Sequence, residues 1–406
     1  MTKQTDERTY LTFDFGTTRT RALSNKPFKE GVDQIVTDEI MTHTLDGSEK
    51  KVYVAYMPSC VLPIKAKNAQ RVQDTKELWG EDAIQRAVSL DDVKVFREGL
   101  LYNAERLGKM YGHFLEAVPG KSDIFAVYSL PPAQLRPMHG VATLKDEENK
   151  KNLEEVRKLI KPEGRVKAIR GIAQNIAGSF MFYKEIYRDK KQTASIWDIG
   201  GGTGDGCLIN FDPDEPYTID FTRFPDLNPV VVMEDKGKNL AGDWRDEELR
   251  RSIQKEYGID IGFQEARRIN IEHSFVGEEE HSELEKYDLR GESGEVVKCD
   301  IRDLVKAPSE RILRAMPGYI ATLAGRAAIA VPKNIQASEN IYLIGGVCAT
   351  EGFGSNLEGI LRQTFNNEKI TVTTCSDNMF PVVRGEYIIA EELTQRNEWE
   401  KEEKKD

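Results

Sequence analysis

The sequence predicts an α/β protein with two domains. At 406 residues the chain is longer than one hydrophobic core usually supports, so two domains are expected. Strand-like runs alternate along the chain with amphipathic helical ones, which favours helices layered on sheets. Two short glycine turns, each opened by an aspartate, lie about half the chain apart and indicate a duplicated architecture rather than a short repeat.

The composition limits the classes of function. Hydrophobic residues make up 39% and charged residues 31%, as in a soluble globular protein. No apolar run reaches the length of a membrane span, and residues 1–10 are polar, so we expect neither a signal peptide nor a direct membrane anchor. A net charge of −11 without a long basic block argues against nucleic acid as a partner. Five scattered cysteines favour a reducing cytoplasm.

The first glycine turn follows the strand-like run Tyr10–Phe13 and includes Asp14, Gly16, Thr17 and Thr18. A strand, a tight turn and a returning strand present consecutive backbone N–H groups to an anion, and threonine hydroxyls add donors. A carboxylate such as that of Asp14 only accepts hydrogen bonds and suits Mg²⁺, directly or through water. Taken alone, the turn fits an ordinary β-hairpin equally well.

A second turn follows the strand-like run Ala194–Trp197. Consecutive glycines cost backbone entropy, so they seldom accumulate where nothing approaches the backbone closely. Asp198, which opens the turn, would orient the water shell of a metal or the attacking water. The phosphate-binding candidates in this turn are Gly200, Gly201, Gly202 and Thr203.

A third glycine turn follows the strand-like run Ile341–Ile344 near the C-terminus. It comprises Gly345, Gly346 and Val347. Three such turns in one chain favour a nucleotide site over three unrelated hairpins.

The order of these turns resembles the actin superfamily, in which two phosphate loops are followed by a Gly-Gly adenosine turn. The similarity covers roughly residues 9–395 and includes segments that resemble actin motifs at Val54–Ser59, Trp79–Ala83 and Val383–Tyr387. Within the superfamily the chain resembles the MamK family, the filament-forming actins of magnetosome chains. That resemblance rests on His273–Gly277, Val296–Asp300 and Ala390–Leu393.

The resemblance implies an actin-like ATPase fold of two lobes, each with a mixed five-stranded sheet flanked by helices, and a nucleotide in the cleft. Lobe I would comprise residues 8–176 and 377–395, with a small subdomain at about 36–78. Lobe II would comprise residues 177–376, with a subdomain at about 223–295. Residues 396–406 form a charged tail.

The resemblance also assigns phosphate contacts in the first turn. Thr17, Thr18 and Arg19 would donate to the β- and γ-phosphates. Arg21 stands where actin carries a phosphate-contacting lysine, and arginine binds phosphate bidentately. The alternative for Arg21 is a surface residue of the returning strand.

Gln174 is the candidate for positioning the hydrolytic water. Its segment falls where bacterial actins carry a Glu-Pro pair and eukaryotic actin carries glutamine. An amide cannot take a proton as a carboxylate can, so it can only hold water in line with the γ-phosphate. The missing Glu-Pro pair argues against fast hydrolysis. The alternative is a glutamine on a helix surface.

The adenosine contacts are assigned by position. Gly345, Gly346 and Val347 would lie under the base or ribose. Asn270 and Glu272 fall near the position of the Lys-Glu pair of actins, and Gly242 would open a helix beside the nucleotide.

These assignments predict a cytoplasmic ATPase that uses ATP and Mg²⁺ and polymerises with itself, with a magnetosome-organising role as the narrower expectation. Adaptor proteins of an organelle or a membrane are expected as further partners. One alternative is a small-molecule kinase of the same superfamily, for which we identify no convincing aspartate base. The other is a non-polymerising ATP-binding module, either a chaperone-type ATPase or an adaptor.

Overall fold

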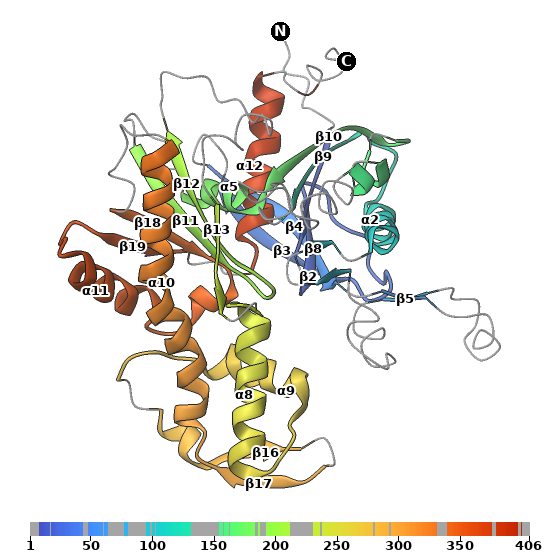
Figure 1. Cartoon of the computed structure of the whole chain (residues 1–406). Helices are drawn as coiled ribbons and strands as arrows, with labels where there is room; N and C mark the ends of the chain where they lie inside the picture. The colour runs from blue at the N-terminus through green and yellow to red at the C-terminus, as the bar shows by residue number, and fades with distance from the viewer. Residues whose placement is uncertain are drawn as a thin grey trace. The chain divides into compact units, whose positions relative to one another are not determined.

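The computed structural model folds as two compact units (Figure 1). The described residues are 8–16, 18–43, 48–59, 61–63, 77–79, 95–97, 100–101, 103–130, 154–156, 158–161, 163–182, 186, 192–211, 230–235, 238–278, 281–291, 294–330, 339–375, 379–396 and 399. The first unit takes the described residues up to 182 and from 380 onward, and the second takes those between. Among the described helices, none is both long and apolar enough to cross a membrane.

The first unit is built on a mixed sheet with the strand order β10-β9-β1-β2-β4-β3. Strands β1, β9 and β10 are parallel to one another, whereas β1, β2, β4 and β3 pair antiparallel in that order. The strands are β1 (Thr9–Phe15), β2 (Arg19–Ser24), β3 (Val36–His43), β4 (Glu49–Pro58), β9 (Ile124–Leu130) and β10 (Val166–Ala173).

This sheet has six strands, so the expectation of five was wrong for the first unit. The additional strand is β3, which pairs with β4 continuously from Val36 opposite Tyr56 to His43 opposite Glu49. Strands β3 and β4 therefore extend the main sheet. Backbone pairing at a sheet edge does not require buried side chains. Most side chains of β3 are exposed, so its sequence shows no clear alternation of buried and exposed residues that would predict a strand.

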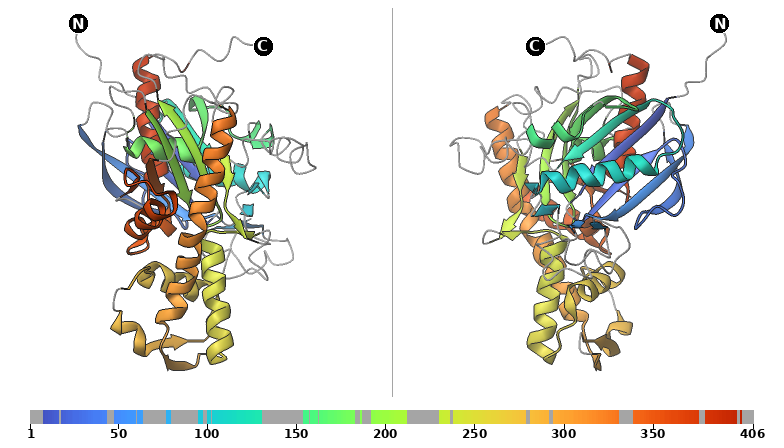
Figure 2. Two further views of the ribbon diagram at one scale, coloured as in Figure 1. Left: turned by 60° about the vertical axis from the view of Figure 1, so that its left-hand side comes forward. Right: turned by 90° about the vertical axis from the view of Figure 1, so that its right-hand side faces the viewer.

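Two layers cover the first sheet on opposite faces (Figure 2). Leu11, Phe13 and Phe15 of β1 pack on one face, in the same core as Met110 and Phe114 of α2 (Ala104–Ala117). The alternate residues of β1 face α12 (Pro381–Arg396), and the hydroxyl of one of them, Thr12, donates to the carbonyl of Val383 at 3.1 Å.

Helix α12 lies against α5 (Gln174–Ser179) at a glycine. A Cβ on Gly385 would lie 1.7 Å from the carbonyl oxygen of Ala177, so no larger residue fits there without a shift of the backbone. Because α5 and the short helix η3 (Phe180–Phe182) pack on α12, residues 177–182 go with the first unit.

The second unit contains a five-stranded mixed sheet in the order β13-β12-β11-β18-β19. Strands β11, β18 and β19 are parallel, and β12 and β13 continue the sheet antiparallel. The strands are β11 (Gln192–Ile199), β12 (Gly204–Phe211), β13 (Val230–Val232), β18 (Asn340–Ile344) and β19 (Thr371–Thr374). Trp197, Leu343 and Phe353 are among its fully buried core residues.

A second core in this unit is built from helices and a hairpin. It gathers Leu249 of α8 (Gly242–Tyr257), Ile269 of α9 (Gly262–His273) and Leu289 of β16 (Tyr287–Arg290), which pairs with β17 (Val296–Cys299). Helix α10 (Arg302–Ala330) contributes to both cores of the unit. The remaining elements are β5 (Val61–Pro63), β6 (Glu77–Trp79), β7 (Phe96–Arg97), β8 (Leu100–Leu101), β14 (Glu234–Asp235), β15 (Lys238–Asn239), η4 (Ser282–Lys286), η5 (Gly346–Ala349) and α11 (Phe353–Phe365).

The glycine contact between α12 and α5 gives a first prediction. Gly385→Ala should lower the free energy of unfolding by about 1–3 kcal/mol, because the new methyl group overlaps the Ala177 carbonyl. Gly359→Ala in α11 is the matched control, since a Cβ there meets nothing within 4 Å and alanine favours the helix. Urea unfolding followed by circular dichroism measures both, and equal midpoints for the two variants would contradict the contact.

Candidate functional site

The first turn joins two strands whose register sets the site. Asp14 of β1 lies directly opposite Arg21 of β2, so the two side chains share one face of the sheet. Arg21 Nη1 lies 2.9 Å from Asp14 Oδ2. A Cβ on Gly16 would lie 2.7 Å from the carbonyl oxygen of Arg19, so the turn excludes a side chain there.

Ser59, the residue that follows β4, forms hydrogen bonds with the backbone of this turn. The Ser59 hydroxyl donates to the Gly16 carbonyl at 2.6 Å, and its N–H donates to the Thr18 carbonyl at 3.0 Å. The guanidinium of Arg19 lies over the ring of Tyr56, 5.9 Å from its centroid. Thr17 lies outside the described residues. The Pro-Ser segment noted in the sequence therefore supports the backbone of the phosphate turn.

Gln174 belongs to the same cluster. It begins α5, directly after β10, and its Nε2 donates to Asp14 Oδ1 at 2.6 Å. Only 6% of the residue is exposed, which rules out the alternative of a helix-surface glutamine. With the amide nitrogen bonded to Asp14, the amide oxygen is the atom that can accept a hydrogen bond from water.

Burial and these partners act in opposite directions on the pKa of Asp14. Burial raises the pKa of its carboxyl, while the charge of Arg21 and the hydrogen bonds from Arg21 and Gln174 lower it. A second carboxyl, Glu386 of α12, is fully buried in the same polar layer. Burial, together with the charge of Asp14, raises the pKa of Glu386 well above its usual value. Sequence reasoning missed this residue, although a glutamate within an apolar helical run was a usable signal.

The second turn is attached to the start of helix α8. Its own backbone is closed by a hydrogen bond from Gly200 N–H to the Thr203 carbonyl at 2.9 Å. Gly242 N–H donates to the Gly200 carbonyl at 2.9 Å, and a Cβ on Gly242 would lie 3.2 Å from Gly201 Cα. Asn239, which the sequence did not single out, donates from Nδ2 to the Gly202 carbonyl at 2.9 Å.

The third turn lies beside the second. Gly345 has φ +94°, and a Cβ there would lie 2.6 Å from Asp198 Oδ1. Gly346 is open, with nothing within 4 Å of a Cβ, whereas the Val347 side chain is buried in the core. Backbone atoms, rather than the Val347 side chain, are therefore what this turn can offer a ligand.

Asp205 adds a second carboxyl to the turn of Asp198. The two residues are opposite each other on β12 and β11. Asp205 is 1% exposed, and burial with a smaller effect of the Glu234 charge raises its pKa to about 7, against a lowering hydrogen bond from Thr203.

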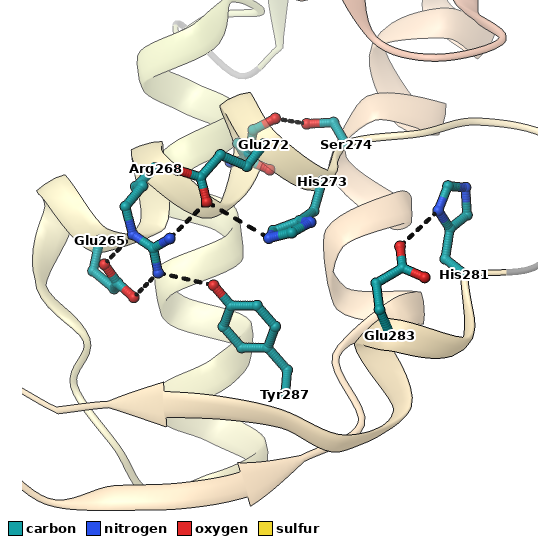
Figure 3. Close-up of polar contacts among 9 residues, drawn as sticks. Glu265, Arg268, Glu272, His273, Ser274, His281, Glu283 and Tyr287 are labelled. Carbon is teal, nitrogen blue, oxygen red and sulfur yellow. Dashed lines mark hydrogen bonds and ion pairs between the residues drawn. The ribbon is translucent and has the colours of Figure 1, made fainter.

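The structure does not bring Asn270 and Glu272 together. Residues two apart on an α-helix point about 200° apart. Asn270 is buried and donates to Asp246 Oδ1 of α8 at 2.9 Å. Glu272 accepts from Arg268 at 2.6 Å on another side of α9, where Arg268 also contacts Tyr287 of β16 (Figure 3).

Asn270 is part of a buried charged cluster that joins α8 and α9. Arg267 of α9 contacts Asp243 at 2.6 Å and Asp246 at 3.0 Å. Arg245 of α8, only 4% exposed, donates to the Thr350 hydroxyl at 2.9 Å. These contacts hold both helices to the segment that follows β18.

Among the described residues, no group of three or more His, Cys, Asp or Glu side chains could hold a metal ion. The residues nevertheless fit Mg²⁺, which keeps several waters and is usually bound by one or two carboxylates together with substrate phosphates. Asp14 and Asp198 each lie at a glycine turn and are the carboxylates suited to that role.

Comparisons with solved structures decide the fold. The chain is similar to a MamK double helical filament, with a TM-score of 0.62 and 20% identity over 95% of this chain and 99% of that one. It is also similar to MreB 5 of Spiroplasma citri bound to AMPPNP, with a TM-score of 0.59 and 15% identity over 97% and 99% of the two chains. The fold is actin-like. No protein-family model and no curated protein matches the sequence.

Asp205 gives a prediction for the stability of this actin-like protein. Its pKa of about 7 in the folded state exceeds the ordinary value of 3.8, so its contribution is fully present below pH 3.8 and is lost as pH rises to 7. Between pH 5 and 8 the loss is on the order of 3 kcal/mol.

Asp205→Asn cannot ionise, so it should gain stability relative to the parent as pH rises from 5 to 8. Thermal unfolding without nucleotide or Mg²⁺ measures the difference. The control is Asp288→Asn on β16, an exposed aspartate whose substitution should leave the pH dependence unchanged. Parallel stability curves for Asp205→Asn and the parent would contradict the raised pKa.

Proposed function

We propose that this chain is an ATPase with an actin-like fold that binds ATP with Mg²⁺ and assembles with copies of itself into cytoskeletal filaments. The observation that carries the proposal is the cluster at the first turn, where Arg21 and Gln174 both hold the buried carboxylate of Asp14. A cation, a carboxylate and a water-holding amide at one glycine turn are the parts that phosphoryl transfer to water requires.

The second turn supports the same proposal. Its closed backbone, the attached N-terminus of α8 and Asp198 form a second anion site of the same chemistry. Each turn would bind phosphate, with Gly345 and Gly346 near the adenosine. Asp14 and Asp198 are the carboxylates that would hold Mg²⁺, and the metal would neutralise charge on the phosphates.

Hydrolysis in this proposal is slow. Gln174 orients the attacking water through its amide oxygen but cannot remove a proton from it. Its bond to Asp14 fixes the amide, so the residue acts by positioning. Slow turnover suits a filament in which the nucleotide acts as a timer: the γ-phosphate favours assembly, and its loss allows the protomers to separate.

Self-assembly is supported by the solved structures that share the fold. One of them is a double helical filament of MamK, and another is a non-polymerising MamK mutant with AMPPNP bound, to which the chain has a TM-score of 0.54 and 19% identity over 95% of this chain and 99% of that one. For this chain we propose a cytoplasmic filament, with magnetosome organisation and organelle-bound or membrane-bound adaptors as the narrower part of the proposal.

Gln174 gives a prediction for the chemistry. Gln174→Ala should leave ATP affinity nearly unchanged and lower the rate of phosphate release by about 10²-fold or more, because the water loses its orienting acceptor. Gln174→Glu should not restore the rate, since it places a second carboxyl where Nε2 now lies 2.6 Å from Asp14.

Single-turnover phosphate release and nucleotide binding measure both effects. The control is Gln254→Ala on α8, in the other unit and outside the proposed site. A parental rate in Gln174→Ala would show that the water is held elsewhere.

Assembly tests the proposed function as a whole. AMPPNP should support filaments at least as long-lived as those formed with ATP, and ADP should support fewer, as measured by pelleting and negative-stain microscopy. Because the chain carries a net charge of −11, moderate salt should aid assembly by screening repulsion between protomers. A protein that stays monomeric in every nucleotide state would favour the kinase or the adaptor instead.

A further inference from the structure

Arg21 is a cation fixed at the first phosphate turn before any ligand arrives. Its Nη1 contacts Asp14 Oδ2 at 2.9 Å, and the two side chains are 22% and 6% exposed. A Cβ on Gly16 would lie 3.5 Å from the same nitrogen, so the guanidinium lies against the glycine turn itself.

The strand register makes this position rigid. Arg21 is flanked in the sheet by Asp14 on β1 and by Tyr56 on β4. A residue on the central part of a paired strand cannot move its backbone without breaking the ladder, so only its side chain can respond to a ligand. The backbone of the paired strand therefore holds the base of this side chain beside the turn.

The guanidinium also keeps donors to spare. It carries five N–H donors and no acceptor. One bond goes to Asp14, and within the described part of the chain the buried Nε has no hydrogen-bond partner. An anion at the turn would satisfy such donors, and guanidinium groups bind phosphate in a bidentate way.

The balance of charge at the turn also favours anion binding by Arg21. Phosphates approaching Asp14 meet a buried carboxylate, and a bound divalent cation is often the group that offsets such a charge. Here the guanidinium of Arg21, 2.9 Å from Asp14, already compensates the carboxylate. The main electrostatic reason for needing the metal during binding is thereby removed.

We propose that Arg21 is a built-in cation that allows this chain to bind a nucleoside triphosphate without Mg²⁺, so that the metal serves hydrolysis rather than binding. This inference rests on the nucleotide binding proposed above. It concerns the binding step alone, and its test needs no turnover.

The experiment measures the affinity of the full chain for AMPPNP by calorimetry, in Mg²⁺ and in EDTA. The parent should lose less than about tenfold in affinity when the metal is removed. Arg21→Gln should lose about 100-fold or more in EDTA and regain most of it in Mg²⁺, since a charge-assisted contact to an anion is lost. Arg21→Lys keeps the charge but lacks the planar guanidinium, so its loss of affinity in EDTA should lie between those of the parent and Arg21→Gln.

The control is Arg251→Gln on α8, which removes an exposed arginine engaged only with Glu247 and Glu248 and should change neither affinity. Arg21→Gln removes the cation that contacts Asp14, so the fold of this variant is checked by circular dichroism. If the variant unfolds, the affinities of the parent and of Arg21→Lys in EDTA test the proposal. Binding by the parent in Mg²⁺ but not in EDTA overturns this inference alone. No binding in either condition overturns the proposed function as well.

Discussion

The buried carboxylate of Asp14 is the interaction around which the first unit is organised. Burial raises its pKa, and the contacts from Arg21 and Gln174, which come from two different elements, oppose that effect. One partner comes from the returning strand and the other from the first turn of α5. The hairpin, the parallel strands β9 and β10 and helix α5 must therefore all be in place for both contacts to form. The fold and the chemistry of the turn depend on the same contacts.

Helix α12 adds a second constraint to this layer. Gly385 lets the helix approach the Ala177 carbonyl, and the next residue, Glu386, is thereby buried beside Asp14. Burial raises the pKa of Glu386, and the charge of Asp14 raises it further, because two ionised carboxyls in one buried layer would repel each other. The raised pKa favours the neutral form of Glu386, which can both donate and accept hydrogen bonds.

The sequence predicted the turns well because their chemistry is local. Glycine clusters directly after strand-like runs indicate turns by themselves, so Gly16, Gly200 and Gly345 could be placed at turns without tertiary information. The Asp14–Gln174 contact joins residues 160 positions apart, and no local pattern contains it. The sixth strand β3 and the separation of Asn270 from Glu272 were missed for the same reason: register and helix phase decide them, and both are fixed by packing. Asn239 and Glu386 gained their positions through contacts that residue type alone does not indicate.

The two glycine turns that follow β1 and β11 differ in what surrounds their carboxylates. At the first turn the guanidinium of Arg21 contacts the carboxyl of Asp14. At the second turn Asp198 lies opposite Asp205, whose pKa of about 7 leaves it partly protonated at neutral pH. A proton, rather than an arginine, then reduces the negative charge there. The charge at the second turn therefore depends on pH near neutrality through Asp205, whereas the first turn has a cation built into its own hairpin.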